Sequence, residues 1–105
     1  MIQDLAPNAF KASLNNDNTI LIDVREDWEF ELCRIEGAQL MPMSAIAETY
    51  TQLDKDAHLA IYCHHGVRSL RVIHFLQSQG YEHLINLQGG IDAWSNKVDN
   101  SVAKY

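Results

Sequence analysis

One segment of the chain brings together the side chains that could carry out chemistry. It reads Cys63-His64-His65-Gly66-Val67-Arg68-Ser69 and directly follows an apolar run that ends at Tyr62. A cysteine between a buried strand and the first turn of a helix faces the free N–H groups and the positive end of the helix dipole. This position favours the thiolate, which is the nucleophilic form of cysteine. We therefore expect Cys63 to act as a nucleophile.

The residues that follow Cys63 suit an anion. Gly66 lets the backbone turn inward, so that successive N–H groups can form an anion-binding nest. Arg68 adds a fixed positive charge with a planar fork that binds oxyanions. A cysteine at a strand end is also common as a buried packing residue, but that role needs no cationic, glycine-containing loop. Neighbouring side chains in a loop point in different directions, so we do not expect both His64 and His65 to contact the sulfur.

Apolar runs alternate with helical patterns along the chain and must position this segment. The predicted strands are 2–3 at an edge, 20–22, 40–41, 59–62 and 84–87. The predicted helices are 7–14, 27–32, 44–50 with Ser44 as its cap, 69–79 ended by Gly80, and 91–97. This alternation predicts an α/β fold with a mostly parallel central sheet of about five strands and helices on both faces. In such sheets ligands bind beyond the carboxyl ends of the strands.

Several polar and aromatic residues near predicted strand ends are candidates for supporting roles. Asp23 should lie at the same sheet edge as Cys63, where its carboxylate either steadies the loop or caps the next turn. Arg25 and Glu29 are four residues apart, a spacing that allows a local ion pair. Trp28 and Trp94 are interpreted as packing residues rather than substrate contacts.

Composition limits the classes of function. The chain has 105 residues and a formal net charge of −6. This length favours one domain, 1–105, with a core over about 4–97 and a tail, 98–105, that packs loosely or frays. The acidic balance argues against nucleic-acid and anionic-lipid binding but not against a small anionic substrate. With no leader pattern and only two cysteines, we expect a cytoplasmic protein without a disulfide, as a monomer or weak homodimer.

Five histidines raise the question of a metal site. A zinc site needs three or four ligands that converge on one point. His58 should lie at the opposite end of its strand from Cys63, His74 on the polar face of a helix, and His83 before another strand. These positions do not converge, so we expect no metal.

Four motifs, in the same order, resemble the rhodanese-like sulfurtransferase family. Residues 63–69 resemble its C-x-x-G-x-R-S loop, and 22–26 resemble its strand-end D-V-R-E. Residues 28–31 and 35–38 resemble W-E-[YF]-E followed by H-I-x-G-A, and 89–94 resemble G-G-[IFV]-x-A-W. Cys33-Arg34 replaces the family's Gly-His, and Glu36 replaces a proline. Cys33 is then either a resolving thiol for Cys63 or a simple replacement in a loop.

The resemblance implies a rhodanese-like fold and a sulfur-transfer reaction without a metal or organic cofactor. A persulfide on Cys63 would carry a sulfane sulfur from a small anionic donor such as thiosulfate to cyanide, a small thiol or a protein thiol. His64, His65, Gly66, Val67, Arg68 and Ser69 would form the substrate-binding loop, with Asp23 and Arg25 in support. One alternative is a sulfur-carrier module whose acceptor is a partner protein. A phosphatase or arsenate-reductase activity is disfavoured, because those relatives place five residues, not four, between cysteine and arginine.

Overall fold

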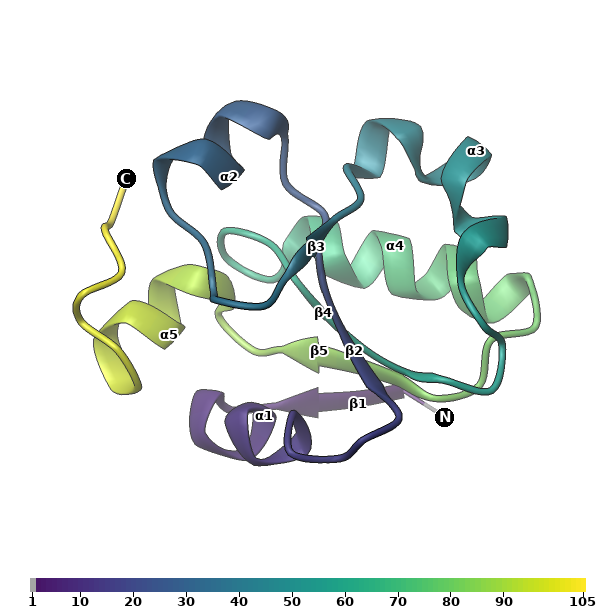
Figure 1. The fold of residues 1–105 in the computed structure, drawn as a ribbon, viewed down its shortest axis with the longest axis horizontal. Helices are drawn as coiled ribbons and strands as arrows, with labels where there is room; N and C mark the ends of the chain where they lie inside the picture. Colours follow the sequence, from purple (N-terminus) through teal and green to yellow (C-terminus); the bar gives the residue numbers. More distant parts are fainter. Residues whose placement is uncertain (1) are drawn as a thin grey trace.

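A five-stranded parallel sheet forms the centre of the computed structural model, which describes residues 2–105 (Figure 1). Met1, which the predicted domain includes, lies outside the described residues. The strands are β1 (Ile2–Leu5), β2 (Thr19–Asp23), β3 (Gln39–Leu40), β4 (His58–Tyr62) and β5 (Leu84–Leu87). Their order is β1-β5-β4-β2-β3, and every neighbouring pair is parallel. The predicted α/β class is confirmed, with each strand within a few residues of its expected place.

The helices lie between the strands, as expected from the sequence. They are α1 (Pro7–Ser13), α2 (Asp27–Leu32), α3 (Ile46–Thr49), α4 (Val67–Ser78) and α5 (Gly90–Lys97). The C-cap of α4 is Gln79, and Gly80 follows it with φ +96°, the left-handed conformation that favours glycine at this position. α4 begins two residues earlier than predicted, because Gly66 serves as its N-cap with φ +105°.

The predicted helix 44–50 is wrong in its start and its continuity. Two 3-10 turns, Met43–Ala45 and Tyr50–Gln52, flank the four residues of α3. Ser44 lies inside the first turn and caps no helix, since its hydroxyl donates to the carboxylate of Glu26 instead (3.1 and 3.2 Å). A serine before an apolar helical pattern can bond to any nearby acceptor, and here the acceptor comes from another element.

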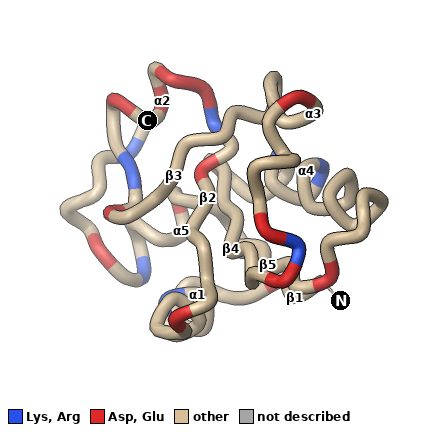
Figure 2. Tube along the Cα trace, turned by 45° about the vertical axis from the view of Figure 1, so that its right-hand side comes forward, with Lys and Arg blue, Asp and Glu red and all other residues tan. Residues whose placement is uncertain are grey.

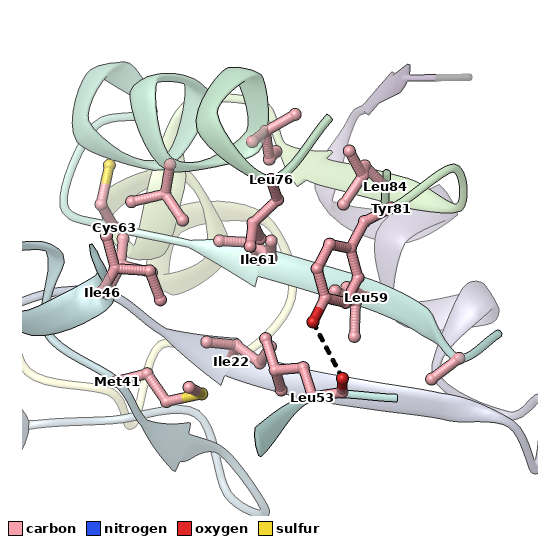
Figure 3. Packing of buried hydrophobic residues seen from close by; sticks show 14 residues of the cluster. Ile22, Met41, Ile46, Leu53, Leu59, Ile61, Cys63, Leu76, Tyr81 and Leu84 are labelled. Carbon is pink, nitrogen blue, oxygen red and sulfur yellow. Dashed lines mark hydrogen bonds between the residues drawn. The ribbon is translucent and has the colours of Figure 1, made fainter. Parts of the chain in front are cut away.

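Helices cover both faces of the sheet and bury two apolar clusters. The first cluster lies under α3 and α4 and includes Leu59, Ile61 and Cys63 from β4 and the residue after it. The second lies under α1 and α5 and includes Ala60 and Tyr62. Alternate residues of a strand face opposite sides, so the period of β4 assigns Cys63 to the α4 side. Figure 3 shows its sulfur pointing towards α4.

The segment 98–105, expected to pack loosely or fray, lies against the second cluster, and its looseness stays a prediction. Val98, Val102 and Tyr105 pack against the second cluster, and the Ser95 hydroxyl donates to the carbonyl of Val102 (2.7 Å). Its irregular backbone still places three apolar side chains on the same face.

Among residues 2–105, no helix is long and apolar enough to span a membrane.

Candidate active site

The loops that follow β2, β4 and β5 meet at the carboxyl edge of the sheet, where a ligand site was expected. The segment after β4, residues 63–68, comprises the loop 63–66 and the first two residues of α4, and is called the active loop below. It packs against α2, which follows β2, and against the start of α5, which follows β5. Neighbouring strands therefore bring together residues that are far apart in the chain.

Peptide N–H groups converge on the sulfur of Cys63. The backbone N–H of Gly66 donates to Sγ at 3.1 Å and that of Ser69 at 3.3 Å. The hydroxyl oxygen of Ser69 lies 3.3 Å from the same sulfur. Cys63 is only 1% exposed and borders the first cluster. The sulfur thus has apolar neighbours on one side and amide donors on the other, an arrangement that stabilises negative charge on it.

A chain of polar groups, buried at Ser69 and Asn86 and exposed at Asp4, holds Ser69 in this position. Its hydroxyl donates to Oδ1 of Asn86 (2.5 Å), and Nδ2 of Asn86 donates to Asp4 (2.9 Å). Asn86 is 1% exposed and lies in the middle of β5. The sequence analysis did not single it out; the available signal was one amide within the apolar run Leu84-Ile85-Asn86-Leu87.

The backbone of α5 supports the active loop from the other side. The N–H of Ile91 donates to the carbonyl of Cys63 (2.9 Å), and that of Asp92 to the carbonyl of His64 (3.2 Å). Gly90 has φ +64°, and a Cβ built there would overlap both carbonyl groups. The second glycine of the 89–94 motif is therefore needed for close backbone contact with the active loop, a role not expected from the sequence.

Arg68 is held in a bidentate ion pair with Glu29 of α2, at 2.7 and 2.8 Å. This corrects the expected Arg25–Glu29 pair. The hydrogen bonds from Arg68 lower the pKa of Glu29 to about 2, and the same contact raises the pKa of Arg68. Figure 2 shows the acidic residues of α2 that lie on this side of the molecule. The cation expected in the loop is present, but a buried carboxylate shares its charge.

Asp23 and Arg25 form a second ion pair, buried completely (2.6 Å). Burial, the largest single influence, lowers the pKa of Arg25, but the hydrogen bonds and charges of Asp23 and Tyr105 together outweigh burial and raise this pKa. The hydroxyl of Tyr62 also donates to Asp23 (2.7 Å). Asp23 also accepts a hydrogen bond from the backbone N–H of Arg25 (2.9 Å), so it caps the next turn as well as contacting the residue before Cys63.

His64 lies in a stack of three rings, between His65 and Tyr105. The ring centroids are 3.9 Å apart on both sides, with interplanar angles of 25° and 8°. Burial, and then the neighbouring His65, lower the pKa of His64, which favours the neutral imidazole at neutral pH. Within the described chain, the hydrogen bonds of the Cys63 sulfur involve neither histidine.

One group among the described residues has metal-ligand composition: His64, His65 and Asp92. Imidazole nitrogens bind a metal in the plane of the ring. The two histidine rings are nearly parallel and stacked, so their in-plane lone pairs do not converge. His58 begins β4 and stacks on His83 (4.5 Å), at the opposite end of the strand from Cys63, as expected.

The two cysteines are both free and lie on opposite faces of the sheet. Cys33 packs against the second cluster, and its carbonyl accepts a hydrogen bond from Arg25 (2.6 Å). This separation argues against a resolving thiol and favours a replacement in a loop.

Trp94 is a packing residue, as expected, with Phe10 at its edge. Trp28 is 62% exposed and belongs to neither cluster, and among the described residues its ring packs only against the ring of Tyr105 (5.8 Å).

Comparison with known proteins gives a consistent result. A family model described as Rhodanese-like domain matches residues 6–97. A sulfurtransferase from Allochromatium vinosum is 35% identical over 81 residues, which are 77% of this chain and 76% of that protein. The thiosulfate sulfurtransferase GlpE from Actinobacillus succinogenes is 28% identical over 91 residues, 87% of this chain and 82% of the relative.

The solved structures agree with the sequence comparison. A rhodanese-like domain protein from Staphylococcus aureus superimposes with a TM-score of 0.82 and 28% identity, covering 98% of both chains. Other matches are to longer proteins: the chain spans only 22% to 31% of the length of the first curated relatives that it matches.

Proposed function

The chain belongs to the family of rhodanese-like domains, and from this premise we propose that it transfers a sulfane sulfur through a persulfide on Cys63. The donor is thiosulfate or a similar small anion, and the acceptor is cyanide or a thiol. The observation that carries the proposal is the pair of backbone N–H groups, at Gly66 and Ser69, that donate to the Cys63 sulfur. The name of the similar GlpE protein supports thiosulfate as donor.

The reaction has two nucleophilic steps. In the first, the thiolate of Cys63 attacks the outer sulfur of thiosulfate; a new S–S bond forms, and sulfite leaves with the electrons of the old one. In the second, the acceptor attacks the outer sulfur of the persulfide, and the Cys63 thiolate is released. The N–H groups of the active loop stabilise the anion before and after each step.

The size of the active loop supports sulfur as the transferred group. Only residues 63–66 separate β4 from α4, and the nearest amide donors are already within 3.1–3.3 Å of the cysteine sulfur. A tetrahedral oxyanion would need a wider loop. We therefore rank sulfur transfer above phosphatase and arsenate-reductase activities as the function of this site.

The test is the intact mass of the protein after incubation with thiosulfate. We expect a gain of one sulfur atom, about 32 Da, as a persulfide on Cys63. Cys63→Ser should gain nothing, whereas Cys33→Ser, the matched control, should gain the same mass as the native chain. Cyanide should then remove the added sulfur as thiocyanate. A native protein that never gains this mass, or a Cys63→Ser variant that does, would refute the proposal.

A sulfur-carrier role with a partner protein as acceptor is the second candidate. The observation in its favour is a set of exposed apolar side chains, Trp28 (62%), Leu32 (52%) and Val67 (63%). They lie on α2 and at the start of α4, the two elements that the Glu29–Arg68 ion pair joins. Slow removal of the sulfur by cyanide and small thiols, with fast transfer to one protein, would favour the carrier role.

A further inference from the structure

Tyr105 bridges the active loop and α2, although it is distant from both in the sequence. Its ring stacks on His64 of the active loop (3.9 Å) and meets the ring of Trp28 edge to face (5.8 Å). Its hydroxyl accepts a hydrogen bond from Nη1 of Arg25 (2.8 Å) and donates one to Glu29 (2.6 Å). One side chain thus contacts both ion pairs of the site and the residue that follows Cys63.

The hydroxyl of Tyr105 is a stable donor in this position. Burial, together with the neighbouring carboxylate of Glu29, raises the pKa of Tyr105 to about 12. The phenol therefore keeps its proton at neutral pH and keeps its hydrogen bond to Glu29. The bonds to Arg25 and Glu29 hold the ring flat against His64.

The segment that carries Tyr105 lies at the edge of the core rather than inside it. Val98 and Val102 are partly buried against the second cluster, whereas Ala103 and Lys104 are exposed. Lys104 contributes only an exposed ion pair with Asp92 (3.8 Å), a kind of contact that adds little stability. Figure 1 shows the yellow end of the chain beside α2. Displacing Tyr105 breaks its bonds to Arg25 and Glu29 and its packing at the edge of the second cluster, but no hydrogen bond between strands.

We propose that Tyr105 is a specificity-determining residue that limits the size of the reactants reaching the sulfur of Cys63. The inference deepens the proposed function and rests on it for the identity of the reacting sulfur. Cys63 is 1% exposed, so a reactant must pass the side chains around the active loop. Tyr105 lies among these side chains, because it contacts His64 and also Glu29, the partner of Arg68. Small anions and small thiols pass with the ring in place. A thiol on a large molecule reaches the sulfur only after the ring leaves His64.

The experiment compares alkylation of Cys63 by a small and a bulky reagent. The native chain is treated with iodoacetamide or with a polymer-linked maleimide, and peptide mass spectrometry follows Cys63 separately from Cys33. The measured quantity is the rate of Cys63 alkylation by the bulky maleimide divided by the rate with iodoacetamide. Tyr105→Ala should raise this ratio about ten-fold or more, since two hydrogen bonds to charged groups are lost with the ring. Tyr105→Phe keeps the ring and should raise the ratio less than Tyr105→Ala.

Tyr50→Ala is the control, because Tyr50 packs against Phe75 and Tyr81, away from the active loop. It should leave the ratio unchanged, and circular dichroism checks that each variant is folded. Equal ratios in the native chain and folded Tyr105→Ala would overturn the inference. Alkylation requires a reactive thiol but no sulfur transfer, so failure of this inference and failure of the persulfide test are separate results.

Discussion

At the scale of single residues, the arrangement of charge is the main finding. Arg68 was expected to present a free cation to an anionic donor, but it forms a bidentate pair with Glu29, which is 3% exposed. The alternative pair expected from spacing, Arg25 with Glu29, does not form because α2 begins only at Asp27. Arg25 precedes the helix, so the rule for residues four apart does not apply to it.

The depressed pKa of Glu29 predicts a specific dependence of stability on pH. A carboxylate whose pKa falls from 4.5 to about 2 on folding stabilises the fold fully above pH 4.5 and loses this effect as the pH falls towards 2. Glu29→Gln should therefore lower the free energy of unfolding by about 2 kcal/mol at neutral pH. The difference between variant and native chain should shrink progressively below pH 4.5.

Urea denaturation of both proteins at several pH values measures this difference. Glu31→Gln is the matched control, because Glu31 is exposed on the same helix; its stability should follow that of the native chain throughout. A constant difference between Glu29→Gln and the native chain from pH 7 to pH 2.5 would contradict the assignment.

At the scale of elements, the contact between the active loop and the start of α5 shapes the site. The carbonyl groups of Cys63 and His64 accept hydrogen bonds from Ile91 and Asp92, and Gly90 permits the close approach. The loop N–H groups can point inward at the sulfur because the loop carbonyls point outward to α5. The β4–loop–α4 unit alone, without β5 and α5, would leave those carbonyls without these partners.

Gly90→Ala should therefore disturb the active loop. The new Cβ would overlap the carbonyl groups of Cys63 and His64, so we expect a loss of several kcal/mol of stability, about 2–4. Thiosulfate should no longer load Cys63 at the native rate. Thermal denaturation and the intact-mass assay measure the two effects.

Gly37→Ala is the control for backbone strain. Gly37 also has positive φ (+88°), but no atom lies within 4 Å of a Cβ built there. This variant should show only the cost of the left-handed conformation, about 1–2 kcal/mol, with normal loading of sulfur. Equal effects of the two substitutions would show that the contact with the active loop is unimportant.

At the scale of the whole molecule, the sheet is covered on both faces, and residues 98–105 complete the cover over the second cluster. This segment has no helical or strand period, yet Val98, Val102 and Tyr105 all pack inward. It also connects the core to the site, because its last residue contacts Arg25, Glu29 and His64. The single-domain organisation, the cytoplasmic location and the monomeric or weakly dimeric state stay predictions.

Val102→Asp should destabilise the molecule by about 1–2 kcal/mol, because a charge would replace a partly buried apolar side chain. Ala103→Asp is the control: Ala103 is exposed in the same segment, so its melting temperature should remain near that of the native chain. A lowered melting temperature in Val102→Asp alone supports a docked segment, and identical melting of both variants would mean that 98–105 adds no stability.

The strands, the parallel α/β class and the place of Cys63 between β4 and α4 are predictable from the amino-acid sequence. These depend on local apolar runs, on glycines at turns and on motifs that lie within a few neighbouring residues. The partners of the site are known only from the folded chain: Glu29 for Arg68, Asn86 for Ser69 and Tyr105 for His64. Those partners come from other elements and from the irregular segment 98–105, and the site's hydrogen bonds join residues up to 82 positions apart, as in the Asn86–Asp4 bond. The pattern of neighbouring residues in the sequence carries no information on such contacts, because strand order and side-chain packing bring the contacting residues together.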